Sequence, residues 1–227
     1  MTRAAPVLLW DLDGTLTDNY LGIARSIAHA LERLGAEVPG HAVLRRCMGP
    51  PLRESFAWLL DTTDAALIEQ AIAHYRERYA DVGWRENAVY DGVEDTLAAL
   101  AATHARMYLC TAKPETYARR IVQLFGLSLH LSGVYGADLA GRLDDKVKLL
   151  AHIAATEGFD PEDAVMIGDR AHDLRAARMN GARCVGVLWG FGSREELAGA
   201  DAIAETPAAL PAAIARVAGS RPSGSSG

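Results

Sequence analysis

The chain has 227 residues, of which 50% are hydrophobic and 23% charged, and its net charge is −6 at pH 7. This composition is typical of a globular protein of one or two domains, and the negative charge argues against a general binder of nucleic-acid polymers. No apolar run approaches the ~20 residues of a membrane span, and three scattered cysteines argue against disulfides or zinc, so we expect a cytoplasmic protein without a membrane partner.

The first predicted element is a strand over residues 7–10, a continuous apolar run that stops at Asp11. Such a run is typical of a strand buried on both faces of a parallel sheet. The strand would deliver Asp11 to the sheet edge where open α/β folds bind ligands, and after Leu12 comes a second carboxylate, Asp13. Two close carboxylates can hold a divalent cation such as Mg²⁺ or divide nucleophile and acid/base roles. The alternative is an Asp-Gly turn in which Asp13 bonds its own backbone.

Residues 17–88 carry helical apolar spacing and no strand signal. The helices predicted in this segment cover residues 20–35, 39–47, 52–60 and 64–82. From residue 89 short apolar strands alternate with helices, which favours a parallel sheet with right-handed crossovers. The later strands are expected at residues 107–110, 133–135, 164–168 and 183–187, and the later helices at 94–102, 114–125, 146–157, 173–180 and 207–217.

The predicted fold class is therefore α/β, a Rossmann-like parallel sheet flanked by helices. Residues 1–16 and 89–219 are expected to form this core domain, and residues 17–88 an inserted all-helical domain. The Ser/Gly-rich residues 220–227 are expected to be a disordered tail.

Three predicted strands end in a polar residue, namely Asp11, Thr111 and Asp169. Because parallel strands share an edge, these side chains should converge. Asp173 follows Asp169 by four residues across a helix start, so the two carboxylates could bind a cation directly or through water. The alternative for Asp173 is a helix N-cap.

Two further segments offer groups for an anion. Thr111, Ala112 and Lys113 form a strand-to-helix turn with a hydroxyl, backbone N–H groups and an ammonium, and helix N-termini bind phosphate; Thr111 could instead be only a helix cap. Lys146 and Lys148 open a helix before the fourth strand, and at most one of them points inward. The alternative for a lone lysine is a solvated side chain. These residues are candidate substrate-binding groups.

The motifs that now stand in order are Asp-Leu-Asp-Gly-Thr at 11–15, Thr-Ala-Lys-Pro at 111–114, Lys146, and Gly-Asp-Arg-x-x-Asp at 168–173. This arrangement resembles the haloacid dehalogenase superfamily of phosphotransferases over residues 6–217, with the helical insert similar to that superfamily's cap domain. The segments Gly-Pro-Pro-Leu at 49–52 and Gly-Phe-Gly-Ser-Arg-Glu-Glu-Leu at 190–197 resemble its phosphoglycolate phosphatase-like and 5′-nucleotidase-like branch.

The resemblance implies a role for each motif. Asp11 would be the nucleophile that becomes an aspartyl-phosphate, and Asp13 would protonate the leaving oxygen and then deprotonate water. Thr111 would hydrogen-bond the phosphoryl oxygens. Lys146 would hold both the phosphate and the nucleophile, with Lys148 as the alternative lysine.

The resemblance also implies a Mg²⁺ cofactor. Asp11, the backbone carbonyl of Asp13, and Asp169 would ligate the ion, with Asp173 behind them. A carboxylate that attacks a dianionic phosphate meets strong repulsion, so a cation, a lysine and backbone amides have to offset that charge.

Within the superfamily, Asp13 argues against a dehalogenase, which protonates no leaving oxygen. The absence of lysine before Lys113 argues against a phosphonate hydrolase, which uses a cap lysine. We expect a phosphatase that acts on a small phosphomonoester, phosphoglycolate-like or a 5′-nucleotide, as a monomer or homodimer. The alternative is a sugar phosphomutase, which keeps all four motifs.

Substrate choice is expected to depend on the helical insert. Arg46 and Arg53 flank the Gly-Pro-Pro break and are candidate contacts for a second anionic group, although a solvated helix face explains them equally well. Trp58 and Trp84 could stack on a base, but burial is the simpler explanation for helix aromatics. The insert is expected to open and close over the site by hinging near residues 17–18 and 87–91.

Overall fold

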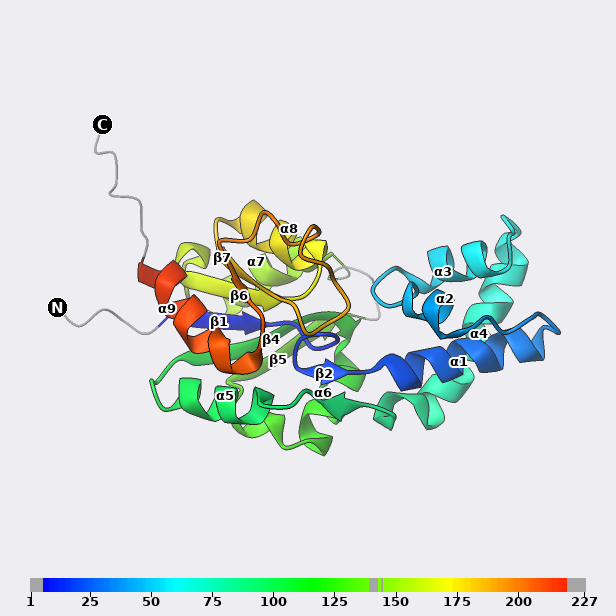
Figure 1. The fold of residues 1–227 in the computed structure, drawn as a ribbon, viewed down its shortest axis with the longest axis horizontal. Helices are drawn as coiled ribbons and strands as arrows, with labels where there is room; N and C mark the ends of the chain where they lie inside the picture. The colour runs from blue at the N-terminus through cyan, green and yellow to red at the C-terminus, as the bar shows by residue number, and fades with distance from the viewer. Residues whose placement is uncertain (1–5, 139–142, 144, 220–227) are drawn as a thin grey trace. The chain divides into compact units, whose positions relative to one another are not determined.

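The structure is a computed structural model, and it describes residues 6–138, 143 and 145–219. The tail predicted at residues 220–227 lies outside the described residues. The described residues form two compact units (Figure 1): a core unit that comprises residues 6–17 and those described from 89 to 219, and a helical unit of residues 18–88. No helix of the described residues is both long enough and apolar enough to cross a membrane.

In the described part of the core unit, six strands form one sheet in the order β5-β4-β1-β6-β7-β8, and their pairings are parallel. The strands are β1 (Val7–Trp10), β4 (Arg106–Pro114), β5 (Gly133–Ala137), β6 (Ala164–Gly168), β7 (Arg183–Val187) and β8 (Ala202–Ala204). Trp10 of β1 pairs with Leu109 of β4 and with Ile167 of β6. Since β4, β1 and β6 are neighbours, Asp11 after β1, Asp169 after β6 and Thr111 within β4 reach the same sheet edge. Strand β4 continues to Pro114, beyond the end predicted at residue 110.

Helices cover both faces of the core sheet (Figure 1). They are α5 (Val93–Ala101), α6 (Glu115–Leu124), α7 (Lys146–Glu157), α8 (Ala171–Asn180) and α9 (Leu210–Gly219), with 3-10 turns η2 (Leu127–Leu129), η3 (Pro161–Asp163) and η4 (Pro207–Ala209). One hydrophobic cluster joins α7 and α8 to alternate residues of the strands, among them Leu9, Cys110 and Met166. The central strands β1 and β6 are buried on both faces, which is why their sequences are continuously apolar.

The helical unit contains α1 (Tyr20–Arg33), α2 (His41–Arg45), α3 (Leu52–Leu59), α4 (Ala65–Asp81) and the 3-10 turn η1 (Gly83–Arg85). Helices α1 and α4 pack along each other, and Ile27 and Ile72 are among their buried side chains. A Cβ atom on Gly22 would lie 2.1 Å from the carbonyl oxygen of Gly83, so the closeness of α1 to η1 requires glycine there. Strands β2 (Thr17–Asp18) and β3 (Ala88–Val89) pair with each other where the chain passes between the units.

The structure confirms the predicted parallel α/β sheet with its inserted helical segment and corrects several details. Strands β2, β3 and β8 were not expected from the sequence. The helix expected at 207–217 starts as the 3-10 turn η4 and becomes α-helical only at Leu210. The helix expected at 173–180 starts two residues earlier, at Ala171. The three cysteines are free, buried thiols.

Candidate functional site

Asp11 lies directly after β1 and is only 4% exposed. Its Oδ1 accepts the backbone N–H of Leu12 at 2.8 Å and lies 2.9 Å from Nζ of Lys146. Burial alone raises the pKa of Asp11, but the ammonium of Lys146, and then His172, outweigh it and hold that pKa well below its usual range. Asp11 is therefore ionised, with one oxygen held by two donors.

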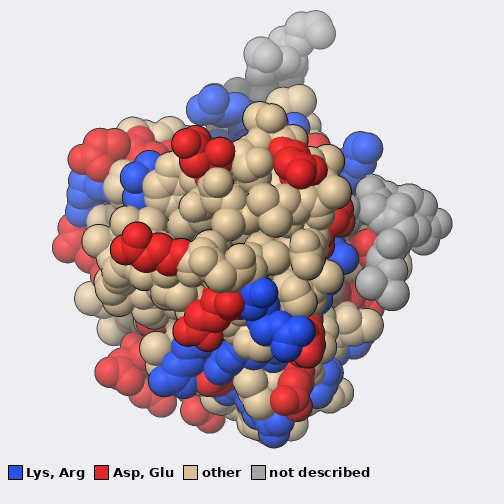
Figure 2. Space-filling model, turned by 90° about the vertical axis from the view of Figure 1, so that its right-hand side faces the viewer, with Lys and Arg blue, Asp and Glu red and all other residues tan. Residues whose placement is uncertain are grey.

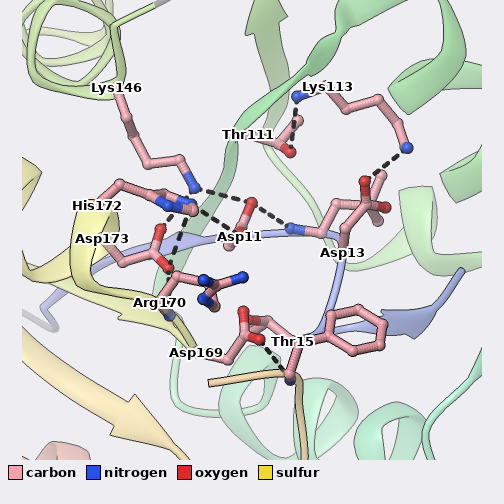
Figure 3. A network of polar contacts seen from close by, with 12 residues as sticks. Asp11, Asp13, Thr15, Thr111, Lys113, Lys146, Asp169, Arg170, His172 and Asp173 are labelled. Atoms are coloured by element: carbon pink, nitrogen blue, oxygen red, sulfur yellow. Dashed lines mark hydrogen bonds and ion pairs between the residues drawn. The ribbon is translucent and has the colours of Figure 1, made fainter. Parts of the chain in front are cut away.

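Lys146 is the first residue of α7, and its ammonium is buried between two carboxylates (Figure 3). Its Nζ lies 2.9 Å from Oδ1 of Asp11 and 2.5 Å from Oδ1 of Asp173. Burial lowers the pKa of Lys146, but the two negative charges raise it well above its usual range. Lys148 is exposed on the same helix. Of the two lysines that open α7, Lys146 is thus the one that meets Asp11.

Asp13 is paired with a different lysine, Lys113. Nζ of Lys113 lies 2.6 Å from Oδ2 of Asp13, whereas Oδ1 of Asp13 is buried without a hydrogen-bond partner among the described residues. Burial raises the pKa of Asp13, and the charge of Lys113 opposes that rise. Thr111 is 1% exposed, and its Oγ1 accepts the backbone N–H of Lys113 at 3.2 Å.

Asp169 follows β6 and is fully buried. Its Oδ2 accepts the backbone N–H of Phe191 at 2.7 Å, and the Thr15 hydroxyl lies 3.4 Å from its Oδ1. Burial, followed by the negative charges of Asp11 and Asp173, raises the pKa of Asp169 to about 7. Asp169 is thus a buried carboxyl beside two other carboxylates, a combination that is frequent at functional sites.

Asp173 is the third residue of α8 and not its N-cap, because the helix starts at Ala171. Its Oδ2 accepts the backbone N–H of Arg170, the N-cap residue, at 3.0 Å, while its Oδ1 meets Lys146. Asp173 therefore combines a structural role at the helix start with a place in the charged cluster.

His172 and Phe191 also belong to this site and were not predicted from the sequence. Nε2 of His172 lies 3.9 Å from Oδ2 of Asp11 and 3.8 Å from Oδ2 of Asp173. Its place directly before Asp173, at a helix start, was an available signal. The contact of Lys113 with Asp13 and the support that Phe191 gives Asp169 carried no such signal, since both depend on how distant segments pack.

The donor set suits a divalent cation. Ligand atoms of Asp11, His172 and Asp173 lie within 4.8 Å of one another, and among the described residues Asp169 stands outside that group. Carboxylate oxygens are the ligands that Mg²⁺ prefers, and the charges of Asp11 and Asp173 add to the effect of burial in raising the pKa of Asp169. This cluster could therefore hold a metal ion.

The predicted substrate contacts Arg46 and Arg53 belong to the helical unit. The guanidinium of Arg46 lies 4.3 Å from the ring centre of Trp58, and Arg53 forms an ion pair with Glu69. The face drawn in Figure 2 likewise places basic and acidic side chains next to one another around an uncharged area. Trp58 is 44% exposed, so it is not the buried aromatic that helical spacing favours.

Comparison with known proteins identifies the family. A model of the haloacid dehalogenase-like hydrolases matches residues 8–187, which is most of the chain. The chain belongs to this family. The match contains the segments that supply Asp11, Thr111, Lys146 and Asp169, and it confirms the resemblance drawn from the motifs.

Three relatives illustrate the similarity of this haloacid dehalogenase-like hydrolase to known proteins. A 5′-nucleotidase of Pseudomonas aeruginosa is 43% identical over 192 residues, which cover 85% of this chain and 86% of the relative. Tyrosine-protein kinase PtkA of Mycobacterium tuberculosis is 39% identical over 186 residues, which cover 82% of this chain but 63% of the relative. The crystal structure of a predicted phosphatase from Clostridium acetobutylicum has a TM-score of 0.86 at 33% identity, covering 94% of this chain and all of that one.

Proposed function

We propose that this family member is a Mg²⁺-dependent phosphatase of the cytoplasm that hydrolyses a small phosphomonoester through an aspartyl-phosphate on Asp11. The observation that supports the proposal is that the two carboxylate oxygens of Asp11 have different contacts. Oδ1 is held by Leu12 and Lys146, and Oδ2 is left toward His172 at 3.9 Å. An ionised carboxylate fixed by one oxygen presents the other as an oriented nucleophile. The reduced, buried cysteines support the cytoplasmic location.

The main obstacle to this reaction is repulsion between Asp11 and the dianionic phosphate. Lys146 offsets part of that charge from a buried position, where an ammonium acts more strongly than in water. The Thr111 hydroxyl and backbone N–H groups of the last residues of β4, where the pairing with β5 is irregular, are proposed to donate to the phosphoryl oxygens. Bound Mg²⁺, with Asp11, Asp13, Asp169 and Asp173 as the proposed holding set, would supply further charge stabilisation.

Proton transfer is assigned to Asp13. In the first half-reaction an Asp11 oxygen forms a bond to phosphorus, the ester P–O bond breaks, and the proton of the Asp13 carboxyl passes to the leaving oxygen. In the second, Asp13 removes a proton from water while the water oxygen attacks phosphorus and the bond to Asp11 breaks. A carboxyl whose pKa is raised by burial, as that of Asp13 is, can carry a proton for this purpose.

For the substrate we propose a 5′-nucleotide or a phosphoglycolate-like ester. The name of the Pseudomonas relative, a 5′-nucleotidase at 43% identity, supports the first. Trp58 would have to stack on a base with the ring face that Arg46 does not cover. Arg46 and Arg53 remain the proposed contacts for a carboxylate of the substrate, and Arg53 would have to exchange its ion pair with Glu69 for that contact.

Phosphate release from a panel of phosphomonoesters, with Mg²⁺ and with EDTA, tests this function. We expect Mg²⁺-dependent release, none from Asp11→Asn, and unchanged release from Asp91→Asn, the same substitution at an exposed turn. Mass spectrometry of the acid-quenched reaction should find phosphate on Asp11. Release that persists in Asp11→Asn would rule out the aspartyl-phosphate.

The name of the mycobacterial relative supports a second candidate, phosphoryl transfer from ATP to tyrosine. The same panel should therefore include ATP with a tyrosine peptide, and sugar phosphates with a bisphosphate activator for the mutase alternative. Phosphotyrosine or an isomerised sugar phosphate, without release of inorganic phosphate from any ester, would replace the phosphatase proposal.

A further inference from the structure

The two proposed catalytic carboxylates are each paired with a different lysine. Lys146 extends from α7 to Asp11, whereas Lys113 extends from the end of β4 to Asp13 (Figure 3). The side chain of Lys113 is 6% exposed, and its Nζ lies 2.6 Å from Oδ2 of Asp13. A buried ammonium this close to a carboxylate forms a strong charge-assisted hydrogen bond. Lys113 is therefore fixed on Asp13 before any substrate arrives.

The contact also distinguishes the two oxygens of Asp13. Oδ2 faces the ammonium, and Oδ1 is buried without a hydrogen-bond partner among the described residues. A carboxyl group held by one oxygen cannot rotate freely, so its other oxygen keeps a constant direction. General acid catalysis requires such alignment between the donor and the leaving oxygen.

We propose that Lys113 is a positioning residue that fixes the carboxyl group of Asp13 for proton transfer to the leaving oxygen, and that it is not a primary contact for the substrate phosphate. This inference rests on the proposed phosphatase function. Lys113 itself neither gains nor loses a proton. It holds Oδ2 while the proton leaves the Asp13 carboxyl, and the carboxylate formed in that step remains paired with the ammonium.

The chemistry of the leaving group separates this role from phosphate binding. An alkyl ester expels an alkoxide that has to be protonated, whereas p-nitrophenyl phosphate expels a stable phenolate that needs no proton. A residue that acts through Asp13 should matter for the alkyl ester and hardly for the aryl ester. A residue that binds the phosphate should matter equally for both, because the two esters share the phosphate.

The test measures kcat and KM of Lys113→Met with p-nitrophenyl phosphate and with the best alkyl ester of the panel. We expect kcat to fall about 100-fold for the alkyl ester, the lower end of what general acid catalysis contributes, and only a few-fold for the aryl ester. KM and inhibition by inorganic phosphate should stay unchanged. Lys148→Met, the same substitution at an exposed position of α7, is the matched control and should behave as wild type with both esters.

A double-substitution cycle with Asp13→Asn tests whether Lys113 acts through Asp13. If it does, Lys113→Met added to Asp13→Asn should cause no further loss with the alkyl ester. Lys113→Arg is run in parallel, and the selectivity between esters is judged on whichever variant keeps the wild-type circular dichroism spectrum. The inference would be overturned by equal losses of kcat with both esters, by a raised KM, or by additive losses of kcat in the cycle. In each of these cases, turnover by the wild-type protein would still support the phosphatase function. A wild-type protein that hydrolyses neither ester would instead overturn the proposed function and this inference with it.

Discussion

Gly14, in the turn between Asp13 and Thr15, is needed for both its conformation and its lack of a side chain. Its φ is +83°, and a Cβ atom there would lie 2.3 Å from Oδ2 of Asp169. Gly190 also approaches Asp169, with a Cβ position 2.5 Å from the same oxygen. The Asp169 carboxylate thus fits between backbone segments that can come this close only as glycine.

A comparison of Gly14→Ala with Gly126→Ala separates the cost of the backbone conformation from the cost of the added Cβ atom. Gly126 has a φ of +70° and nothing within 4 Å of its Cβ position, so Gly126→Ala should cost only the backbone strain of about 1 kcal/mol. Gly14→Ala adds the clash with Asp169 and should cost about 1–3 kcal/mol more, with loss of phosphate release. Urea unfolding of both variants measures the difference, and equal costs would show that Asp169 moves aside freely.

The positions of the site residues were easier to predict than their contacts. Asp11, Thr111 and Asp169 follow apolar runs that predict buried parallel strands, and the sheet order brings those strand ends together. The family resemblance implied the contact of Lys146 with Asp11, whereas nothing in the sequence predicted that Lys113 meets Asp13. Lys113 is two residues beyond Thr111, whereas its partner Asp13 comes before the helical unit in the sequence, so the contact joins segments that are far apart along the chain.

At the scale of elements, the sequence predicted long segments well and short ones poorly. The helix expected at 146–157 is α7, with the same ends, because its apolar spacing is regular. Strand β8, Ala202–Ala204, was missed because alanine is a weak strand former. Its pairing with β7 decides its structure, and that pairing is not local in the sequence.

Glu86, which follows η1, ties together the two long helices of the helical unit. Its carboxylate accepts hydrogen bonds from Arg78 of α4 at 2.7 and 3.0 Å, and it lies 2.7 Å from Arg25 of α1. The hydrogen bond from Arg78 is the largest influence and lowers the pKa of Glu86, with burial opposing it. The charged form of Glu86 therefore stabilises the folded unit.

From this pKa shift we predict a pH-dependent cost for Glu86→Gln. Because the pKa of Glu86 is lowered in the folded state, the stabilisation that its charge gives is complete above the ordinary pKa of 4.5. This stabilisation is lost as the pH falls through the pKa of the folded state. Glu86→Gln should lower the free energy of unfolding by about 1 kcal/mol at pH 7, and the gap should narrow below pH 4.5. Glu32→Gln, at an exposed position of α1, is the control for urea unfolding across this pH range. A gap that widens toward acid would contradict the argument.

At the scale of the whole molecule, the core sheet is assembled from parts of the chain that are far apart. Val7 pairs with Arg106 on one side and with Ala164 on the other, so the central strand gains its partners only after long loops close. The same assembly gathers Asp11, Asp169 and Asp173 at one sheet edge, where burial and mutual repulsion raise the pKa of Asp169 to about 7. Folding therefore concentrates negative charge that a bound cation would relieve.

We therefore predict that Mg²⁺ stabilises the whole protein and that Asp169→Asn abolishes the effect. A ligand that binds only the folded state, at a hundred times its dissociation constant, raises the free energy of unfolding by about 2.7 kcal/mol. In EDTA, Asp169→Asn should be at least as stable as wild type, since it removes a buried charge that faces like charges. Calorimetric unfolding in Mg²⁺ and in EDTA, at matched ionic strength, measures both effects, and Glu94→Gln at an exposed position of α5 is the control. If Mg²⁺ raised the free energy of unfolding equally in wild type and Asp169→Asn, the ion would bind elsewhere. If Asp169→Asn were the more stable protein in EDTA and wild type the more stable in Mg²⁺, binding of the ion would depend on this carboxylate.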